Sequence, residues 1–159
     1  MPTSSRLIGL ISDTHGLVRP GVHEALKGVE IILHAGDVGG AEILDELKLI
    51  APVRAVFGNT DPPGMAELTT SIEMEIDGLR IHVSHGNEVG SPTPERLAAR
   101  YDSDVVIYGH SHRQLVTKLG GQLFVNPGAA GPRRFNLSAS VGILKIVDGK
   151  PEVSIVDIA

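Results

Sequence analysis

The segment LIGLISDTH at residues 7–15 passes from apolar residues directly into Asp13 and His15. A short apolar run that ends in a polar turn is typical of a buried β-strand. Ligands of open α/β sheets gather just beyond the carboxyl ends of such strands, which is where Asp13 and His15 fall. Side chains two residues apart at a strand end point to one side, so this pair could bind an ion together. The segment therefore predicts an α/β fold with a metal-type site at the carboxyl edge of its sheet.

The same arrangement recurs further along the chain. Other apolar runs end in Gly36-Asp37, Gly58-Asn59, Ser84-His85-Gly86 and Gly109-His110-Ser111-His112. A glycine beside a ligand lets the backbone turn sharply and pass close to an ion. We therefore expect the metal-type side chains to converge on one edge of one sheet, and these are Asp13, His15, Asp37, Asn59, His85, His110 and His112.

The first half of the chain alternates strand and helix patterns. Buried strands are expected at 7–11, 31–33 and 53–57, and helices at 20–27 and 41–50. Strands joined by helices imply right-handed crossovers and parallel pairing.

The second half is rich in hairpins. A half-exposed strand at 72–76 turns at Asp77-Gly78 into a strand at 79–83, and a helix is expected to begin at 93–95. Further signals are a buried strand at 105–107, a hairpin at Gly120-Gly121 and a second hairpin at Asp148-Gly149 joining 141–147 to 153–156. Two sheets packed face to face with helices outside would bury both halves. We expect one domain spanning residues 1–159.

The composition limits the classes of function. The chain has 159 residues, is 42% hydrophobic and carries a formal net charge of −5. This charge argues against a protein that binds long nucleic acid through its phosphates. The chain contains no cysteine, so a metal would take oxygen and nitrogen ligands. No stretch resembles a signal peptide or a membrane helix, which predicts a cytoplasmic protein. Association into a homo-oligomer is compatible with this composition.

The candidate ligands suit two divalent transition metal ions better than one. Such pairs lie about 3.5–4 Å apart and clamp the attacking and leaving oxygens of a phosphate ester. Mixed imidazole and oxygen ligands favour Mn, Fe, Co, Ni or Zn, and we expect Mn. Taken singly, Asp37 and Asn59 are ordinary turn residues and His85 an ordinary core histidine. Their joint placement after apolar runs favours the metal site.

The ordered set Asp-x-His, Gly-Asp, Gly-Asn, His and Gly-His-x-His resembles the calcineurin-like metallophosphoesterase superfamily. The segments at 58–61 and 126–128 resemble its compact single-domain bacterial and archaeal phosphodiesterase branch. The resemblance implies a four-layer α/β/β/α sandwich of two mixed β-sheets flanked by helices. It also implies hydrolysis of a small phosphoester by a hydroxide that bridges two metal ions, with Asp37, Asn59 and His85 as catalytic residues.

The resemblance also assigns ligands to each ion. By carry-over, one ion takes Asp13, His15, Asp37 and His112. The other ion takes Asp37, Asn59, His85 and His110, so that Asp37 bridges the pair.

The chain departs from the superfamily where many members have a histidine after the Gly-Asn pair. Here Thr60 occupies that place, and its hydroxyl is a poor proton donor for a leaving group near neutral pH. We expect Asn59, Thr60 and Arg133 to contact substrate, and Arg134 is a further candidate. The ordinary alternative for the two arginines is that they are solvated residues of a loop.

Other polar residues could support the site. Asp61 could orient ligands or hydrogen-bond His85, and Asn126 could line the site. The alternative for both is a purely structural role in a turn, which Asp61 would have beside Pro62-Pro63 and Asn126 beside Pro127-Gly128. His34 near the Asp37 loop is a similar case.

Two other functions fit the same pattern. One is a catalytically weak or inactive metal-binding interaction scaffold, as in the retromer subunit of this superfamily. The other is a phosphomonoesterase or nucleotide hydrolase. The retained ligand set favours an enzyme.

Overall fold

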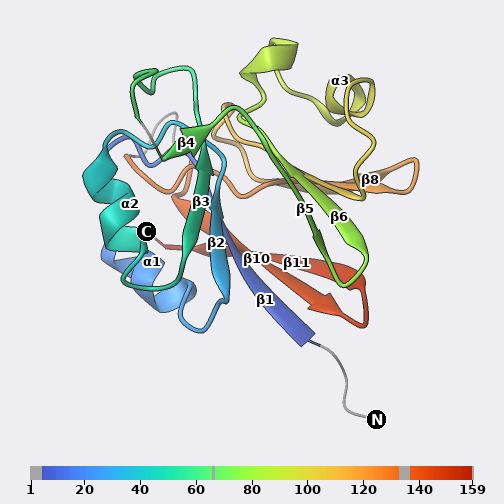
Figure 1. Cartoon of the computed structure of the whole chain (residues 1–159), viewed down its shortest axis with the longest axis horizontal. Helices are drawn as coiled ribbons and strands as arrows, with labels where there is room; N and C mark the ends of the chain where they lie inside the picture. The colour runs from blue at the N-terminus through green and yellow to red at the C-terminus, as the bar shows by residue number, and fades with distance from the viewer. Residues whose placement is uncertain (1–4, 66, 133–136, 159) are drawn as a thin grey trace.

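Two mixed β-sheets face each other in the computed structural model, which describes residues 5–65, 67–132 and 137–158 (Figure 1). The first sheet has the strand order β11-β10-β1-β2-β3-β4, in which β1, β2, β3 and β4 run parallel. Its strands are β1 (Ser5–Ile11), β2 (Ile31–His34), β3 (Val53–Val56), β4 (Leu68–Thr69), β10 (Ser140–Val147) and β11 (Lys150–Asp157).

The second sheet has the order β5-β6-β7-β9-β8. Its three central strands are parallel, and antiparallel hairpins close both edges. Its strands are β5 (Ile72–Ile76), β6 (Leu79–Val83), β7 (Val105–Ile107), β8 (Leu115–Leu119) and β9 (Gln122–Asn126).

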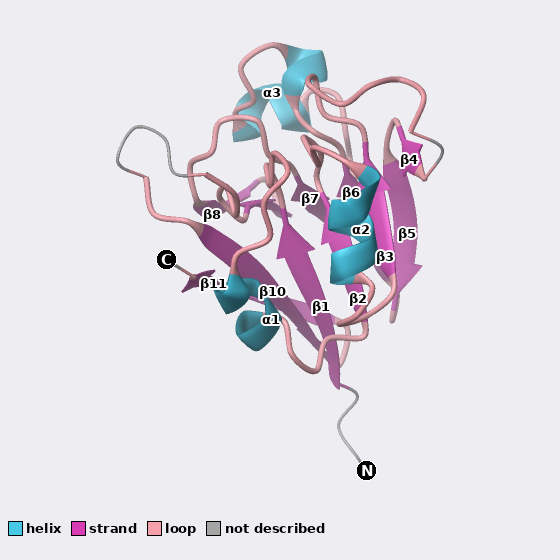
Figure 2. Ribbon diagram, turned by 90° about the vertical axis from the view of Figure 1, so that its left-hand side faces the viewer, coloured by secondary structure: helices cyan, strands magenta, loops and turns pink. Residues whose placement is uncertain are grey.

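Short helices cover the outer faces of the two sheets. Helices α1 (Pro20–Ala25) and α2 (Ala41–Leu47) pack on the first sheet, and Figure 2 looks onto that face. Helix α3 (Pro94–Ala98) packs on the second sheet through Leu97, after the 3-10 turn η1 (Asn87–Val89). Within the described residues, no helix has the length and apolar character needed to cross a membrane.

Three hydrophobic clusters define the layers. The central cluster lies between the sheets and includes Ile8 and Leu33 from the first sheet and Ile107 and Val125 from the second. A second cluster joins α1 and α2 to the first sheet, and a third joins α3 to Val106 and Phe124. The α/β fold with two mixed sheets is confirmed.

The element boundaries differ from the prediction mainly at helix ends. The helices expected at 20–27 and 41–50 end at Ala25 and Leu47 and continue as turns. After α1, the left-handed φ of 89° at Gly28 prevents a further helical turn. The two-residue strand β4 and the turn η1 were not predicted, because neither has an apolar period of its own.

The prediction that all ligands share one edge of one sheet is wrong. Strands β1, β2 and β3 belong to the first sheet, whereas β6 and β7 belong to the second. The parallel strands of both sheets end at the same side of the sandwich, since residues that follow strands of one sheet hydrogen-bond there to residues that follow strands of the other. The candidate site therefore lies across the carboxyl edges of two sheets.

Candidate metal centre

Asp13, His15 and His112 form the first group of metal-type side chains. Asp13 Oδ1 lies 3.7 Å from His15 Nε2 and 3.4 Å from His112 Nε2. The two imidazole nitrogens are themselves 3.4 Å apart. Three ligand atoms thus face a common point, although His112 lies 97 positions after His15 in the chain.

The second group contains Asp13, Asp37 and His85, so the two groups share Asp13. His85 Nε2 lies 3.3 Å from Asp37 Oδ2 and 3.9 Å from Asp13 Oδ1. Asn59 extends this group, because its Oδ1 lies 3.0 Å from both His85 Nε2 and His110 Nδ1. The structure thus brings all the predicted ligands together.

The carboxylate of Asp13 has one satisfied and one unsatisfied oxygen. Oδ2 accepts hydrogen bonds from Ser12 Oγ at 2.7 Å and from the His110 backbone N–H at 3.2 Å. Oδ1 is buried and has no hydrogen-bond partner among the described residues. A buried unsatisfied carboxylate oxygen is costly, and a cation among the surrounding imidazole nitrogens would satisfy it. The donor set therefore fits divalent metal ions.

The backbone is strained at the candidate ligands. Non-glycine residues with positive φ in the described part of the chain include Asp13 (54°), His15 (45°), Asp37 (56°), His110 (73°) and His112 (63°). The others are Asp77 and Asp148, which lie in the tips of hairpins. Residues held in this region cost on the order of 1–3 kcal/mol each and cluster at functional sites.

Missing β-carbons allow the ligand loops to approach one another. A Cβ at Gly58 would lie 2.1 Å from both the backbone N and Oδ1 of Asp37. A Cβ at Gly109 would lie 2.0 Å from Ser12 Oγ and 2.7 Å from Asp13 Oδ2. The glycines of these signatures are therefore needed for space around the carboxylates.

Asp61 ties two of the ligand loops together. Its buried carboxylate accepts hydrogen bonds from the backbone N–H groups of Val38 at 3.1 Å, Gly39 at 3.1 Å and Gly58 at 2.9 Å. It does not bond His85, which was one expected role. Instead, His85 Nδ1 lies 2.7 Å from the carbonyl oxygen of Ala35, so Nε2 faces Asp37 and Asn59.

Asn126 supports the loop that carries His110 and His112. Its Nδ2 donates to the carbonyl of Gly109 at 3.2 Å and to Ser111 Oγ at 3.0 Å, and its Oδ1 accepts from Gly128 N–H at 2.9 Å. Because Asn126 is fully buried, these bonds fix the loop from beneath.

His34 connects the Asp13 loop to the Asp37 loop. Its Nδ1 accepts from Gly36 N–H at 3.1 Å, so Nε2 carries the proton and donates to Thr14 Oγ1 at 2.9 Å. Thr14 in turn donates to the carbonyl of Val38 at 2.7 Å. Burial lowers the pKa of His34 to about 4, so this imidazole is neutral at physiological pH.

Opposite shifts in pKa mark the acidic and basic members of the cluster. Burial acts to raise the pKa of Asp13, but the nearby imidazoles of His112 and His15 outweigh it and hold the pKa well below its usual range. Burial likewise acts to raise the pKa of Asp37, but the nearby His85 lowers it. Burial acts to lower the pKa of His85, but Asp37 and Asp13 raise it. The cluster therefore favours charged carboxylates.

The remaining candidates fall in different places. Thr60 donates its backbone N–H to Asp37 Oδ1 at 2.9 Å, so it orients a candidate ligand. Arg133, expected to contact substrate, and Arg134 lie outside the described residues. Ser12 and Thr14 were assigned no role from the sequence, because serine and threonine beside a ligand have many ordinary uses.

Buried aspartates and histidines that meet at the carboxyl edges of two mixed sheets define a protein of metallophosphoesterase type. A model of the calcineurin-like phosphoesterase superfamily domain matches residues 7–149, and the chain belongs to this superfamily.

Relatives of known class support this membership. The chain is 35% identical over 160 residues to a protein of Methanothermobacter thermautotrophicus described as a probable metallophosphoesterase, covering 94% of this chain and 91% of that one. It is 29% identical over 139 residues to a phosphodiesterase of Methanocaldococcus jannaschii, covering 76% and 82% of the two chains. The solved structure of Vps29 from Entamoeba histolytica with Zn²⁺ has a TM-score of 0.77 and 26% identity, over 96% and 99% of the chains.

The neutral buried His34 predicts a loss of stability in acid. The unfolded chain binds a proton at this residue below about pH 6.5, whereas the folded chain does so only near 4. The stability that depends on neutral His34 is present above pH 6.5 and is lost as the pH falls towards 4, by about 3 kcal/mol. Urea unfolding of wild type and His34→Gln measures the difference between their free energies of unfolding. This difference should decrease by that amount as the pH falls from 6.5 to 4. Parallel pH profiles would contradict the prediction.

The close approach of Gly58 to Asp37 predicts a steric effect on metal binding. Gly58→Ala should push the Asp37 carboxylate aside and weaken Mn²⁺ binding about 10–100-fold, as disturbed ligand supports typically do. Gly64→Ala is the matched control, since a Cβ there meets no atom of the described residues within 4 Å and neither glycine has a left-handed φ. Calorimetric titration of both variants tests this, and equal affinities would count against a ligand role for Asp37.

Proposed function

We propose that the chain is a phosphodiesterase that depends on two divalent transition metal ions. The observation that carries this proposal is the pair of histidine and aspartate groups that share Asp13. Two adjacent ligand groups of this kind suit the in-line displacement of a phosphate ester, in which one oxygen attacks as another leaves. Membership of the superfamily and the relatives described above support the same chemistry.

In this proposal, each ion has four protein ligands. One ion is bound by Asp13, His15, Asp37 and His112, and the other by Asp37, Asn59, His85 and His110. Support for a bridging Asp37 comes from its Oδ2, which lies 3.6 Å from His15 Nε2 and 3.3 Å from His85 Nε2. Asp13 Oδ1 also faces both groups and would balance the charge of the pair. We expect Mn, while Fe, Ni, Co or Zn would suit the same ligands.

The bound ions would polarise the phosphoryl oxygens and make a water acidic enough to react at neutral pH. The chain's own residues fix the geometry of the step. Ala35 and Asp61 hold His85 and the Asp37 loop in place, and Asn126 does the same for His110 and His112. Direct attack by a water-derived nucleophile needs no covalent phospho-enzyme. The amide of Asn59, near the rim of the site, would contact the phosphoryl group.

An interaction scaffold is the alternative function. The similarity to Vps29 is the observation that favours this alternative, because that protein has a similar fold and was solved with Zn²⁺. Retention of a complete ligand cluster with an unsatisfied buried carboxylate oxygen favours the enzyme. Full metal occupancy without hydrolysis of any phosphoester would favour the scaffold instead.

Removal of metal should abolish hydrolysis, and Mn²⁺ should restore it. Apoprotein prepared with a chelator is screened with Mn, Fe, Co, Ni and Zn against aryl phosphodiesters and phosphomonoesters. Asp37→Asn, which loses the charge of the proposed bridge, should lower kcat/KM by at least about 10³-fold. The control is Asp45→Asn, which changes an exposed aspartate on α2. Wild-type rates in Asp37→Asn would defeat the bridging role.

The threonine at position 60 predicts a preference among substrates. A leaving group of high pKa needs a proton donor, which typically contributes roughly 10²–10⁴-fold, whereas an aryl leaving group does not. The chain should therefore hydrolyse aryl phosphodiesters faster than alkyl phosphomonoesters. Paired kcat/KM values measure this ratio, and a clear preference for monoesters would contradict the role given to Thr60.

A further inference from the structure

A small pocket lies on the second sheet, beside the loop that carries His110 and His112. Its volume is about 280 Å³, and it lies between the start of α3 and the start of β8. Pro92, Pro94, Tyr108 and Leu115 contribute apolar surface to its lining. Ser111 and Arg113 supply polar groups.

Two parts of the pocket lining are continuous with the candidate ligands. Ser111 lies between His110 and His112 in the chain, so the loop that carries both histidines contributes to the lining. Pro92 also lines the pocket, and its ring packs on Gly86, because a Cβ at Gly86 would lie 2.9 Å from Pro92 Cβ. Gly86 directly follows His85. A molecule bound at the metal centre could therefore extend into this pocket.

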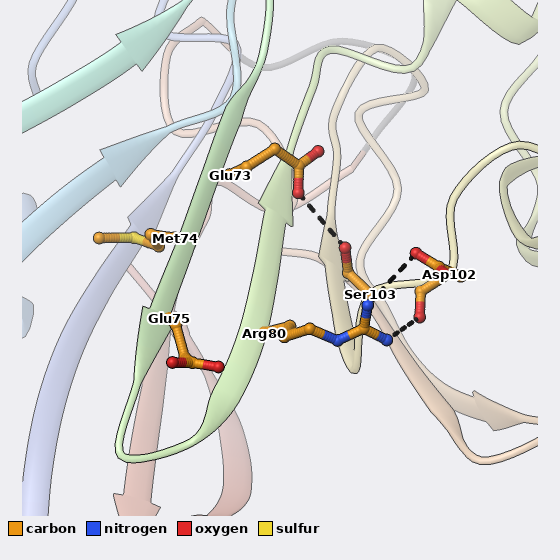
Figure 3. A pocket seen from close by; sticks show the side chains of 6 residues that line it. All are labelled: Glu73, Met74, Glu75, Arg80, Asp102 and Ser103. Atoms are coloured by element: carbon orange, nitrogen blue, oxygen red, sulfur yellow. Dashed lines mark hydrogen bonds and ion pairs between the residues drawn. The ribbon is translucent and has the colours of Figure 1, made fainter.

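The charge of the pocket suits a ligand that carries phosphate. None of its described lining residues is acidic, and Arg113 contributes a guanidinium group, in a chain of net charge −5. A larger open pocket of about 430 Å³ beside β5 and β6 has the opposite character (Figure 3). Glu73, Glu75 and Asp102 line it, and its Arg80 is already engaged by Asp102. That pocket would repel a phosphate ester.

The size and the walls of the smaller pocket define what it can bind. An apolar cavity of about 150 Å³ holds one benzene molecule, so this pocket accommodates a single ring system but not a polymer. Proline and leucine walls offer flat apolar surface, which favours burial of an uncharged ring. Leu115 is 36% exposed on strand β8, and a ring seated against it would remove that apolar surface from water.

We propose that this pocket binds the aromatic or heterocyclic ring of one ester group of a phosphodiester whose phosphate lies at the metal centre. The proposal rests on the proposed function and specifies its substrate class as diesters with a ring substituent. Leu115 is then a specificity-determining residue, and Arg113 favours the approach of the anionic substrate.

Binding of two phosphonates tests the proposal without relying on turnover. The Mn²⁺-loaded chain is titrated calorimetrically with methylphosphonate and with 2-phenylethylphosphonate, which share a metal-binding head group and differ in the ring. The ring-bearing probe should bind about tenfold more tightly, as expected for partial burial of one ring. Leu115→Asp should abolish this difference, because it removes apolar surface and adds a negative charge.

Leu119→Asp is the matched control. Leu119 is 39% exposed, lies on the same face of β8 and is absent from the pocket lining, so this variant should keep the tenfold difference. Thermal unfolding checks that both variants fold, and Leu115→Ala replaces Leu115→Asp if the latter does not. Equal affinity for the two probes in wild type, or a difference that survives in the Leu115 variants, would overturn the proposal. Failure of both phosphonates to bind would overturn the proposed metal centre together with it.

Discussion

The carboxylate of Asp13 is the constraint on which this edge of the molecule depends. One of its oxygens is fixed by Ser12 and by the backbone of His110. The other faces imidazole nitrogens from both sheets and receives no hydrogen bond from the described part of the chain. A buried charge in this state is stable only beside compensating positive charge. The opposite pKa shifts of Asp13 and His85 show how the chain supplies part of that compensation through its own histidines. The same geometry explains why a divalent cation suits the cluster.

The hydrogen-bond network around the ligands explains how strained backbone persists there. Left-handed conformations at Asp13, Asp37 and His110 are unfavourable by themselves. Asp61 and Asn126, both buried, each bond several backbone or side-chain groups of the ligand loops. Their bonds offset part of the strain and hold the ligands in position before any substrate arrives. This is the ordinary condition for a preorganised site.

Much of the fold and the site follows from the sequence, because the informative signals are local. Apolar runs ending in polar signatures located the parallel strands, and Asp77 and Asp148 were recognisable as hairpin turns. The division of ligands between two sheets was not predictable, since strand periodicity carries no information about which strands pair. The partners of Asp61 and His34 depend on contacts between residues distant in the chain, so motif spacing could not reveal them. The strand β4 is too short for any period.

The placement of ligands on two sheets has a mechanical consequence. The distance between the sheets is set by side chains such as Ile8, Leu33 and Val125, which fill the space between them. Changing the volume of these side chains would move one half of the ligand cluster relative to the other. The separation of the two halves can thus be adjusted from the hydrophobic interior, by residues that contact neither ion nor substrate. Natural or engineered variants could alter the reactivity of this centre by repacking the interior while every ligand stays unchanged.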